Sequence, residues 1–225
     1  MLDLCLSVIA SRSKYDRIQA KLCQREKGHS GKHDEKPFLR ELIKTNPQVA
    51  NKIVRDAIMT TGASWKSEGA GPNRILRWVM LLSDEELAAF GIRMKGLKPQ
   101  VVAKLRDKAA TYEDCVQVAK KLTWLAYQMP DAPELSNETT SYLEEHFGKL
   151  QPNSAVCLVC REPLSFNLFS GAVRGKAIIE TGHSNPRSHN AENVGFAHRE
   201  CNIAQGSKTL PEFYGWIEEI LKRAE

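Results

Sequence analysis

Four side chains that can bind a metal ion lie in two short pairs in the last third of this 225-residue sequence. Cys157 and Cys160 form a C-x2-C pair, and His198 and Cys201 form an H-x2-C pair further along the chain. Zinc prefers four thiolate or imidazole ligands in a tetrahedron, and structural sites take them in such pairs. The spacing therefore predicts a closed structural zinc site with no open position for a reacting water.

A second set of chemical groups lies between the two zinc pairs, in the stretch AIIETGHSNPRSHNAENVGFAHRECN. A run of β-forming residues ends at His183, and a proline-containing loop follows it. Asn193 opens a second β-like run, and Asn202 stands at the start of a helical stretch. In content and order this segment, from Cys157 to Thr209, resembles the HNH family of ββα-metal nucleases.

The resemblance implies a phosphodiester-cleaving site. In that family the strand-end histidine is the general base, the loop asparagine fixes its orientation, and the helix residue after the cysteine binds the catalytic metal. These roles fall on His183, Asn193 and Asn202. A neutral imidazole suits proton abstraction when its other nitrogen is tied to an acceptor such as a main-chain carbonyl across the loop. The amide oxygen of Asn202 is a hard ligand that suits Mg²⁺ and disfavours zinc.

One position departs from the pattern of the family. Many HNH enzymes have an aspartate or histidine directly before the general base as a second metal ligand, whereas this chain has Gly182. Water and DNA phosphates can complete an octahedral magnesium shell, so Asn202 alone can hold the ion. Glu180 is a second candidate ligand, and we expect it to need a bulge or turn at Thr181-Gly182 to reach the same site. The alternative is a decayed site in which the zinc module only binds DNA.

Two further residues of the proline-containing loop have polar surroundings. His189 is predicted to be a surface histidine, because no neighbouring residue supports a catalytic role. Arg187 is a candidate contact to the scissile phosphate, and a solvated loop arginine is the alternative.

Four more potential ligands occur near the start of the chain. Cys23, His29 and His33 lie in LCQREKGHSGKH, where glycines allow tight turns between ligands, and Cys5 would complete a Cys2His2 set. The spacing of the two histidines fits a zinc site, whereas the separation of the two cysteines is wider than usual. A second zinc site and four unrelated side chains therefore both remain open.

Helical periodicity predominates from Pro37 to about Met129. Apolar residues recur at spacings of three and four in PFLRELIKTNPQVANKIVRDAIM, NRILRWVMLLSDEELAAFG, PQVVAKLRDKAA and EDCVQVAKKLTWLAYQM. Ser83 and Glu86 form a capping-box pattern, so we expect a helix to begin at Ser83 within the second of these stretches. Cys115, in the last stretch, is predicted to be a buried thiol.

Basic side chains gather on a predicted loop and helix start of this helical region. They can contact DNA phosphates or form an ordinary solvated face, and the sequence leaves both alternatives open. The formal net charge of +5 favours an anionic partner without identifying one. The residues concerned are Arg93, Lys95, Lys98, Lys104, Arg106 and Lys108.

The pattern of residues changes after residue 130. Residues 131–150 are predicted to form a linker and a short helix, and the short β-like runs AIIET and NVGFA follow. A helical start at HRECN and an amphipathic helix, LPEFYGWIEEILKR, complete the chain. The predicted class is α+β: a mainly helical DNA-binding domain over residues 1–130, then a zinc-braced ββα-metal nuclease domain over residues 151–225.

Together these features predict a magnesium-dependent, site-specific endonuclease of double-stranded DNA, similar to type II restriction endonucleases that use HNH modules. The alternatives are a modification-dependent or nicking HNH nuclease, and a non-catalytic zinc protein that binds DNA. Because one HNH site cuts one strand, double-strand cleavage predicts a homodimer. The sequence shows neither a signal peptide nor a membrane-length apolar run, so we expect a cytoplasmic protein of bacterial or phage type. No small-molecule substrate is expected.

Overall fold

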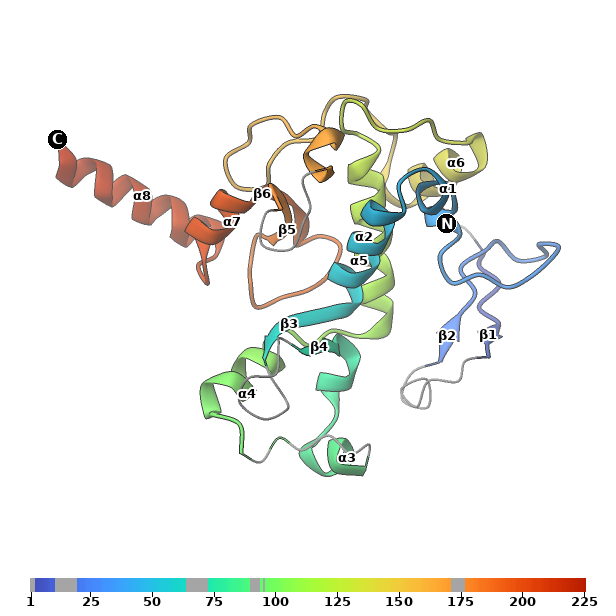
Figure 1. Cartoon of the computed structure of the whole chain (residues 1–225), viewed down its shortest axis with the longest axis horizontal. Helices are drawn as coiled ribbons and strands as arrows, with labels where there is room; N and C mark the ends of the chain where they lie inside the picture. Colours follow the sequence, from blue (N-terminus) through green and yellow to red (C-terminus); the bar gives the residue numbers. More distant parts are fainter. Residues whose placement is uncertain (1–2, 11–19, 64–72, 90–93, 95, 171–176) are drawn as a thin grey trace.

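The structure is a computed structural model that describes residues 3–10, 20–63, 73–89, 94, 96–170 and 177–225. A central body of helices has a β-hairpin extension on one side and the last helix, α8 (Leu210–Ala224), projecting on the other (Figure 1). None of the helices in these ranges is both long and apolar enough to cross a membrane.

The N-terminal part is mainly helical, as the sequence predicts. A short antiparallel hairpin of β1 (Val8–Ile9) and β2 (Lys21–Leu22) precedes the helices. Prolines start three of these helical elements, because the first turn needs no N–H from them. The helical elements are η2 (Pro37–Leu39), α1 (Arg40–Thr45), α2 (Pro47–Ile58), α3 (Asp84–Ala89), α4 (Pro99–Arg106), α5 (Tyr112–Ala126) and α6 (Asn137–Phe147).

The stretch that begins at Asn73 differs from its prediction. It forms strand β4 (Asn73–Leu76), antiparallel to β3 (Met59–Ala63), and then the 3-10 helix η3 (Arg77–Leu81). The helical prediction for Asn73–Leu76 is wrong because pairing with β3 outweighs a weak local preference. The predicted helix start at Ser83 is confirmed: its hydroxyl accepts from the N–H of Glu86 at 3.2 Å, and its own N–H donates to the Glu86 carboxylate at 2.8 Å.

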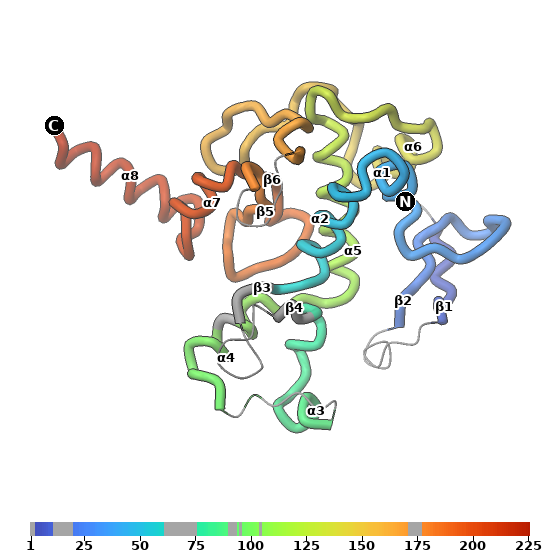
Figure 2. Tube along the Cα trace, viewed as in Figure 1, coloured from blue at the N-terminus to red at the C-terminus, as the bar shows by residue number. Residues whose placement is uncertain are grey.

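The C-terminal part contains the predicted succession of two strands and two helices. β5 (Ile179–His183) and β6 (Val194–His198) pair antiparallel, and α7 (Arg199–Gln205) and α8 follow them. A further 3-10 helix, η4 (Phe166–Phe169), precedes the hairpin. The chain trace shows the hairpin between α5 and α7 (Figure 2).

One hydrophobic core joins the helical part to this hairpin. Val118 and Leu122 on α5 pack in the same buried cluster as Ile179 on β5 and Phe196 on β6. Cys115 lies in a neighbouring core, where it is 0% exposed, so the predicted buried thiol is confirmed. The strand that ends at His183 is therefore packed directly against the helical part.

The predicted linker contributes to the same core. Within residues 131–150, α6 buries Tyr142 and Leu143, and the ring of Tyr142 stacks on Phe38 of η2. Ser136 caps the helix, since its hydroxyl accepts from the N–H of Thr139 at 3.3 Å. The segment thus includes the predicted short helix, and this helix packs against the helical part.

Candidate active site and metal centres

Cys157, Cys160, His198 and Cys201 converge on one point. Their ligand atoms all lie within 4.8 Å of one another. The Nδ1 atom of His198 is 3.4 Å from the Cys160 sulfur and 4.0 Å from the Cys201 sulfur. Tetrahedral zinc with ordinary bond lengths separates a thiolate sulfur from an imidazole nitrogen by about 3.6 Å. The donor set and its spacing therefore fit a tetrahedral metal ion.

The local electrostatics of this cluster also favour a cation. Burial raises the pKa of the Cys157 thiol, but N–H groups of the Cys160, His198 and Val159 backbone lower it further than burial raises it. Burial and the neighbouring Cys160 and Cys157 thiols raise the pKa of Cys201 to about 12. Thiolates this close together repel each other, which disfavours their ionisation. A bound divalent cation offsets that repulsion.

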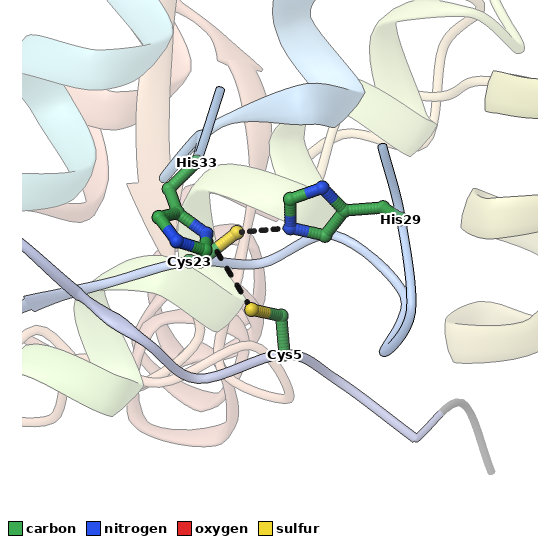
Figure 3. A group of neighbouring side chains, drawn as sticks. All are labelled: Cys5, Cys23, His29 and His33. Carbon is green, nitrogen blue, oxygen red and sulfur yellow. Dashed lines mark hydrogen bonds between the residues drawn. The ribbon is translucent and has the colours of Figure 1, made fainter. Parts of the chain in front are cut away.

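The four N-terminal ligands also converge, as Figure 3 shows. The Cys23 sulfur is 3.3 Å from Nε2 of His29, and the Cys5 sulfur is 3.5 Å from Nδ1 of His33. All four ligand atoms lie within 4.8 Å of one another. The segments carrying the two cysteines run antiparallel, with the Cys23 N–H donating to the Ser7 carbonyl at 2.9 Å, so the wide sequence separation closes in space. The four side chains are therefore neighbours in the structure, as a second zinc site requires.

His183 stands at the end of β5 and is linked to the helical part through a second histidine. Its Nε2 atom is 2.9 Å from Nδ1 of His189, whose Nε2 is 2.7 Å from the Ala57 carbonyl oxygen. His189 is only 5% exposed, so its prediction as a surface histidine is wrong. The physical reason is that the polar loop folds over the end of α2, where main-chain carbonyls lack partners within the helix.

This chain of hydrogen bonds defines where the hydrogens lie. The Ala57 carbonyl can only accept, so Nε2 of His189 donates to it and Nδ1 of the neutral ring accepts. His183 therefore donates from Nε2, and the lone pair of its neutral ring lies on Nδ1. Burial, together with the charges of Arg77 and Lys108, lowers the pKa of His183 to about 4. His183 is therefore linked to a main-chain carbonyl as expected, but the link is made through His189 and is not direct.

Asn193 holds the loop that carries His189. Its side-chain oxygen accepts from the Ser184 hydroxyl at 2.5 Å and from the Asn185 N–H at 2.7 Å. Its amide nitrogen donates to the carbonyls of Asn185 and Ser188. In this geometry Asn193 acts on His183 indirectly, by fixing the loop between the two histidines.

Asn202 on α7 faces the strand that carries His183. Its amide nitrogen donates to Glu180 at 2.9 Å, and the Arg199 guanidinium lies 3.4 Å from the other oxygen of that carboxylate. The β5–β6 register is continuous from Ile179 to His183. The bulge expected for Glu180 is therefore absent, since a regular strand already turns this residue toward α7.

Gly182 lies close to the amide oxygen of Asn202. A Cβ atom at position 182 would lie 3.2 Å from the Cβ of Ala197 and 3.6 Å from Oδ1 of Asn202. Since the amide nitrogen donates to Glu180, Oδ1 is the atom of Asn202 that lies on the side of Gly182. A side chain at position 182 would therefore begin in contact with the Cβ of Ala197 and Oδ1 of Asn202.

Sequence reasoning missed a buried ionic group beside β5. The Thr181 hydroxyl donates to Asp56 on α2 at 3.1 Å, and Asp56 also pairs with Lys52 at 2.7 Å and Arg55 at 2.8 Å. Burial raises the pKa of Asp56, but the two cations lower it further than burial raises it. The i,i+4 spacing of Lys52 and Asp56 was the only local signal, and it is typical of ordinary helix surfaces.

The predicted DNA-contacting residues have different surroundings. The Arg106 guanidinium donates to Asp84 at 2.7 Å and to two main-chain carbonyls, so we do not count it among the phosphate contacts. Lys98 and Arg187 are exposed, while the Lys108 carbonyl accepts from Arg77. The Arg93 and Lys95 residues and the side chain of Lys104 lie outside the described residues.

The chain resembles a solved structure described as a type II restriction endonuclease, with 46% sequence identity and a TM-score of 0.87. The match covers 99% of each chain. The family model of DraIII, a restriction endonuclease family, matches residues 35–201. The chain therefore belongs to the DraIII family, and the predicted class of enzyme, a site-specific DNA endonuclease, is confirmed. No curated protein matches the chain.

Proposed function

We propose that this protein is a type II endonuclease that cleaves double-stranded DNA at specific sites with an HNH-type ββα-metal centre formed by β5, β6 and α7. The observation that carries the proposal is the state of His183. Its Nε2 atom is tied through His189 to a main-chain carbonyl, which leaves Nδ1 as a base. Asn202, held by Glu180, is the hard ligand on the adjoining helix.

In this mechanism Nδ1 of His183 takes a proton from the water that attacks phosphorus, while the bond to the leaving oxygen breaks. The residues fit magnesium, since one amide oxygen with water and DNA phosphates satisfies its preferred shell. Bound at Asn202, the ion would stabilise the charge that develops on the leaving oxygen. Both oxygens of Glu180 already face donors, so we assign it the positioning of the Asn202 amide instead of direct coordination.

We assign a structural zinc ion to each Cys/His cluster. The C-terminal ion would tie the Cys157–Cys160 turn to the start of α7, one residue before Asn202. It would therefore fix the distance between the metal ligand and the strand of His183. The N-terminal ion would hold the β1–β2 extension, which contributes little to the hydrophobic core beyond Leu4.

The zinc assignment predicts two zinc ions in each purified chain, one for each cluster. Cys160→Ser and Cys5→Ser should each retain one, because the clusters share no ligand. Atomic emission analysis of dialysed protein measures this content. Cys115→Ala is the matched control and should retain both ions, since Cys115 is buried in a core away from either cluster. A folded, active protein without zinc would contradict both assignments.

His189 gives a test of the positioning of the base. His189→Gln keeps an acceptor for His183 and a donor for Ala57, whereas His189→Phe keeps neither. We expect the phenylalanine variant to lose about tenfold to a hundredfold in kcat with DNA affinity unchanged, and the glutamine variant to recover most of that loss. Nitrogen NMR shifts of His183 report the tautomer directly. Wild-type kcat and an unchanged tautomer in the phenylalanine variant would remove His189 from this role.

Digestion of methylated and unmethylated plasmids tests the type of enzyme. The proposal predicts discrete linear fragments from unmethylated DNA, formed with Mg²⁺ and suppressed by chelation of the ion. Cleavage of methylated DNA alone would indicate a modification-dependent enzyme, and open circles as the only product would indicate a nicking enzyme. A purified, zinc-loaded protein that cuts no plasmid would contradict the catalytic proposal.

A further inference from the structure

The main-chain carbonyl of His183 points out of the β5–β6 hairpin. In an antiparallel pair of strands, residue pairs that exchange main-chain hydrogen bonds alternate with pairs that do not. The Ser184 N–H donates to the Asn193 carbonyl at 2.9 Å, so these two residues form a bonded pair. The neighbouring pair in the register, His183 and Val194, is therefore not bonded, and β5 pairs with no other strand among the described residues. The His183 carbonyl thus needs a partner outside the sheet.

Gln205 on α7 supplies that partner. Its side-chain amide nitrogen donates to the His183 carbonyl at 2.8 Å and to the Lys208 carbonyl at 3.0 Å. A primary amide has two hydrogens to donate, so both are used. Gln205 is only 1% exposed, which keeps water from competing for these bonds. The glutamine therefore fixes the last residue of β5 to α7.

The turn after α7 brings the second carbonyl within reach of Gln205. Gly206 follows the last residue of the helix with a φ of 61°, a backbone conformation that favours glycine. The chain reverses at this point, and the Lys208 N–H donates to the Gln205 carbonyl at 3.2 Å. The turn therefore anchors the Gln205 side chain, whose remaining hydrogen is directed at His183.

Helix α7 packs against β5 (Figure 1), and two of its side chains hold the strand at separate points. Asn202 donates to the Glu180 carboxylate at 2.9 Å, near the start of the strand. Gln205 donates to the carbonyl of His183, at the end of the strand. Residues three positions apart in a helix lie on the same side of it. One turn of α7 therefore carries both the proposed metal ligand and the residue that holds the proposed base.

We propose that Gln205 is a positioning residue of this endonuclease: by holding the main-chain carbonyl of His183 to α7, it sets the place of the imidazole relative to Asn202. The inference rests on the proposed function and adds a residue that acts through His183 without contacting the reacting atoms. If the carbonyl lost this bond, the peptide group could turn, and the Cα–Cβ bond of His183 would move with it. Misplacement of a reacting group by about 1 Å can cost about a hundredfold in rate.

Gln205→Met tests this role, because methionine is similar in length and has no donor. We expect single-turnover cleavage of a plasmid fragment by the full, zinc-loaded chain to slow about tenfold to a hundredfold. Affinity for the same fragment in Ca²⁺ and the Mg²⁺ concentration for half-maximal rate should not change, because Asn202 keeps its bond to Glu180. Gln205→Asn, whose amide is one methylene shorter, is a second variant with the same expectation. A raised Mg²⁺ requirement in both variants would place Gln205 at the metal instead and overturn the inference.

Gln128→Met is the matched control for the loss of a buried glutamine. Gln128 is 4% exposed, and its side-chain oxygen accepts from the Ser154 hydroxyl at 3.2 Å. The substitution should lower the melting temperature and leave the cleavage rate at that of the wild type. Slowing of cleavage in this control as large as in Gln205→Met would show that the rate follows stability alone, and the positioning role would be wrong.

The double variant that combines His183→Ala with Gln205→Met shows whether Gln205 acts through His183. Effects of two residues that act through one group are not additive. We therefore expect the double variant to cleave at the rate of His183→Ala alone. A further slowing of about tenfold in the double variant, or a wild-type rate for Gln205→Met, would overturn the inference and leave the proposed function intact. A wild-type rate for His183→Ala would instead contradict the proposed function itself.

Discussion

Replacement of His183 by alanine is expected to slow DNA cleavage by about a hundredfold to ten-thousandfold, the usual effect of losing a general base. DNA affinity should change little, because no phosphate contact is assigned to this side chain. Single-turnover cleavage at saturating enzyme measures the rate, and binding to the same duplex in Ca²⁺ measures the affinity. The control is Ser207→Ala, an exposed change on the turn between α7 and α8, which should cleave at the wild-type rate.

The pH dependence of the wild type checks the same role. Burial and nearby cations lower the pKa of His183 to about 4, so the neutral base is already present at neutral pH. We expect kcat/KM to stay level as the pH falls from 8 to about 6 and to decline as it approaches 4. Below about 6.5 the folded protein also loses stability, since the unfolded chain binds protons that the buried, neutral histidine does not. Rates are therefore compared only where circular dichroism shows folded protein. A His183→Ala variant with wild-type rates would contradict the assignment.

Asn202→Ala should produce the second large loss, about a hundredfold at low Mg²⁺, with partial recovery as the Mg²⁺ concentration rises. The reason is that Oδ1 is the proposed hard ligand of the ion, while the amide nitrogen donates to Glu180. Titration of the cleavage rate with Mg²⁺ separates loss of metal affinity from loss of the chemical step. A variant that reaches the wild-type rate at low Mg²⁺ would remove Asn202 from the metal site.

Glu180 supplies a matched pair for the same titration. Glu180→Gln keeps an oxygen that accepts from the Asn202 amide, so it should need only a modest increase in Mg²⁺. Glu180→Ala removes the acceptor, frees the amide to rotate and should require a larger increase. Equal, severe losses in both variants would indicate that the carboxylate coordinates the metal directly, and the positioning role would then be wrong.

Local sequence patterns predicted the parts of the site whose residues are close in the chain. Cys157 and Cys160 lie on one turn, and His198 and Cys201 lie at the start of a helix, so their spacing alone marks them as candidate ligands. The strand that ends at His183 was predictable for the same reason. The pairing of Cys5 with Cys23 stayed open at the level of sequence, because it depends on antiparallel pairing between the segments that carry them.

The groups missed by sequence analysis depend on contacts between distant segments. His189 meets the Ala57 carbonyl across 132 positions of the chain, and Thr181 meets Asp56 across 125. From sequence, a histidine in a polar loop is expected to be solvated. Its burial becomes clear only when the structure shows the helix end that it covers. The strand that begins at Asn73 was missed for a related reason, since only its pairing with β3 makes it extended.

The central claim is that His183 and the metal bound at Asn202 act on one phosphate. The most direct measurement is an anomalous-scattering map of the His183→Ala protein crystallised with its DNA site and Mn²⁺. We expect a manganese peak at about 2.2 Å from Oδ1 of Asn202, with the scissile phosphate between the ion and the vacated imidazole position. A peak on another residue, such as Asp56, with Oδ1 of Asn202 facing protein atoms alone would contradict the account.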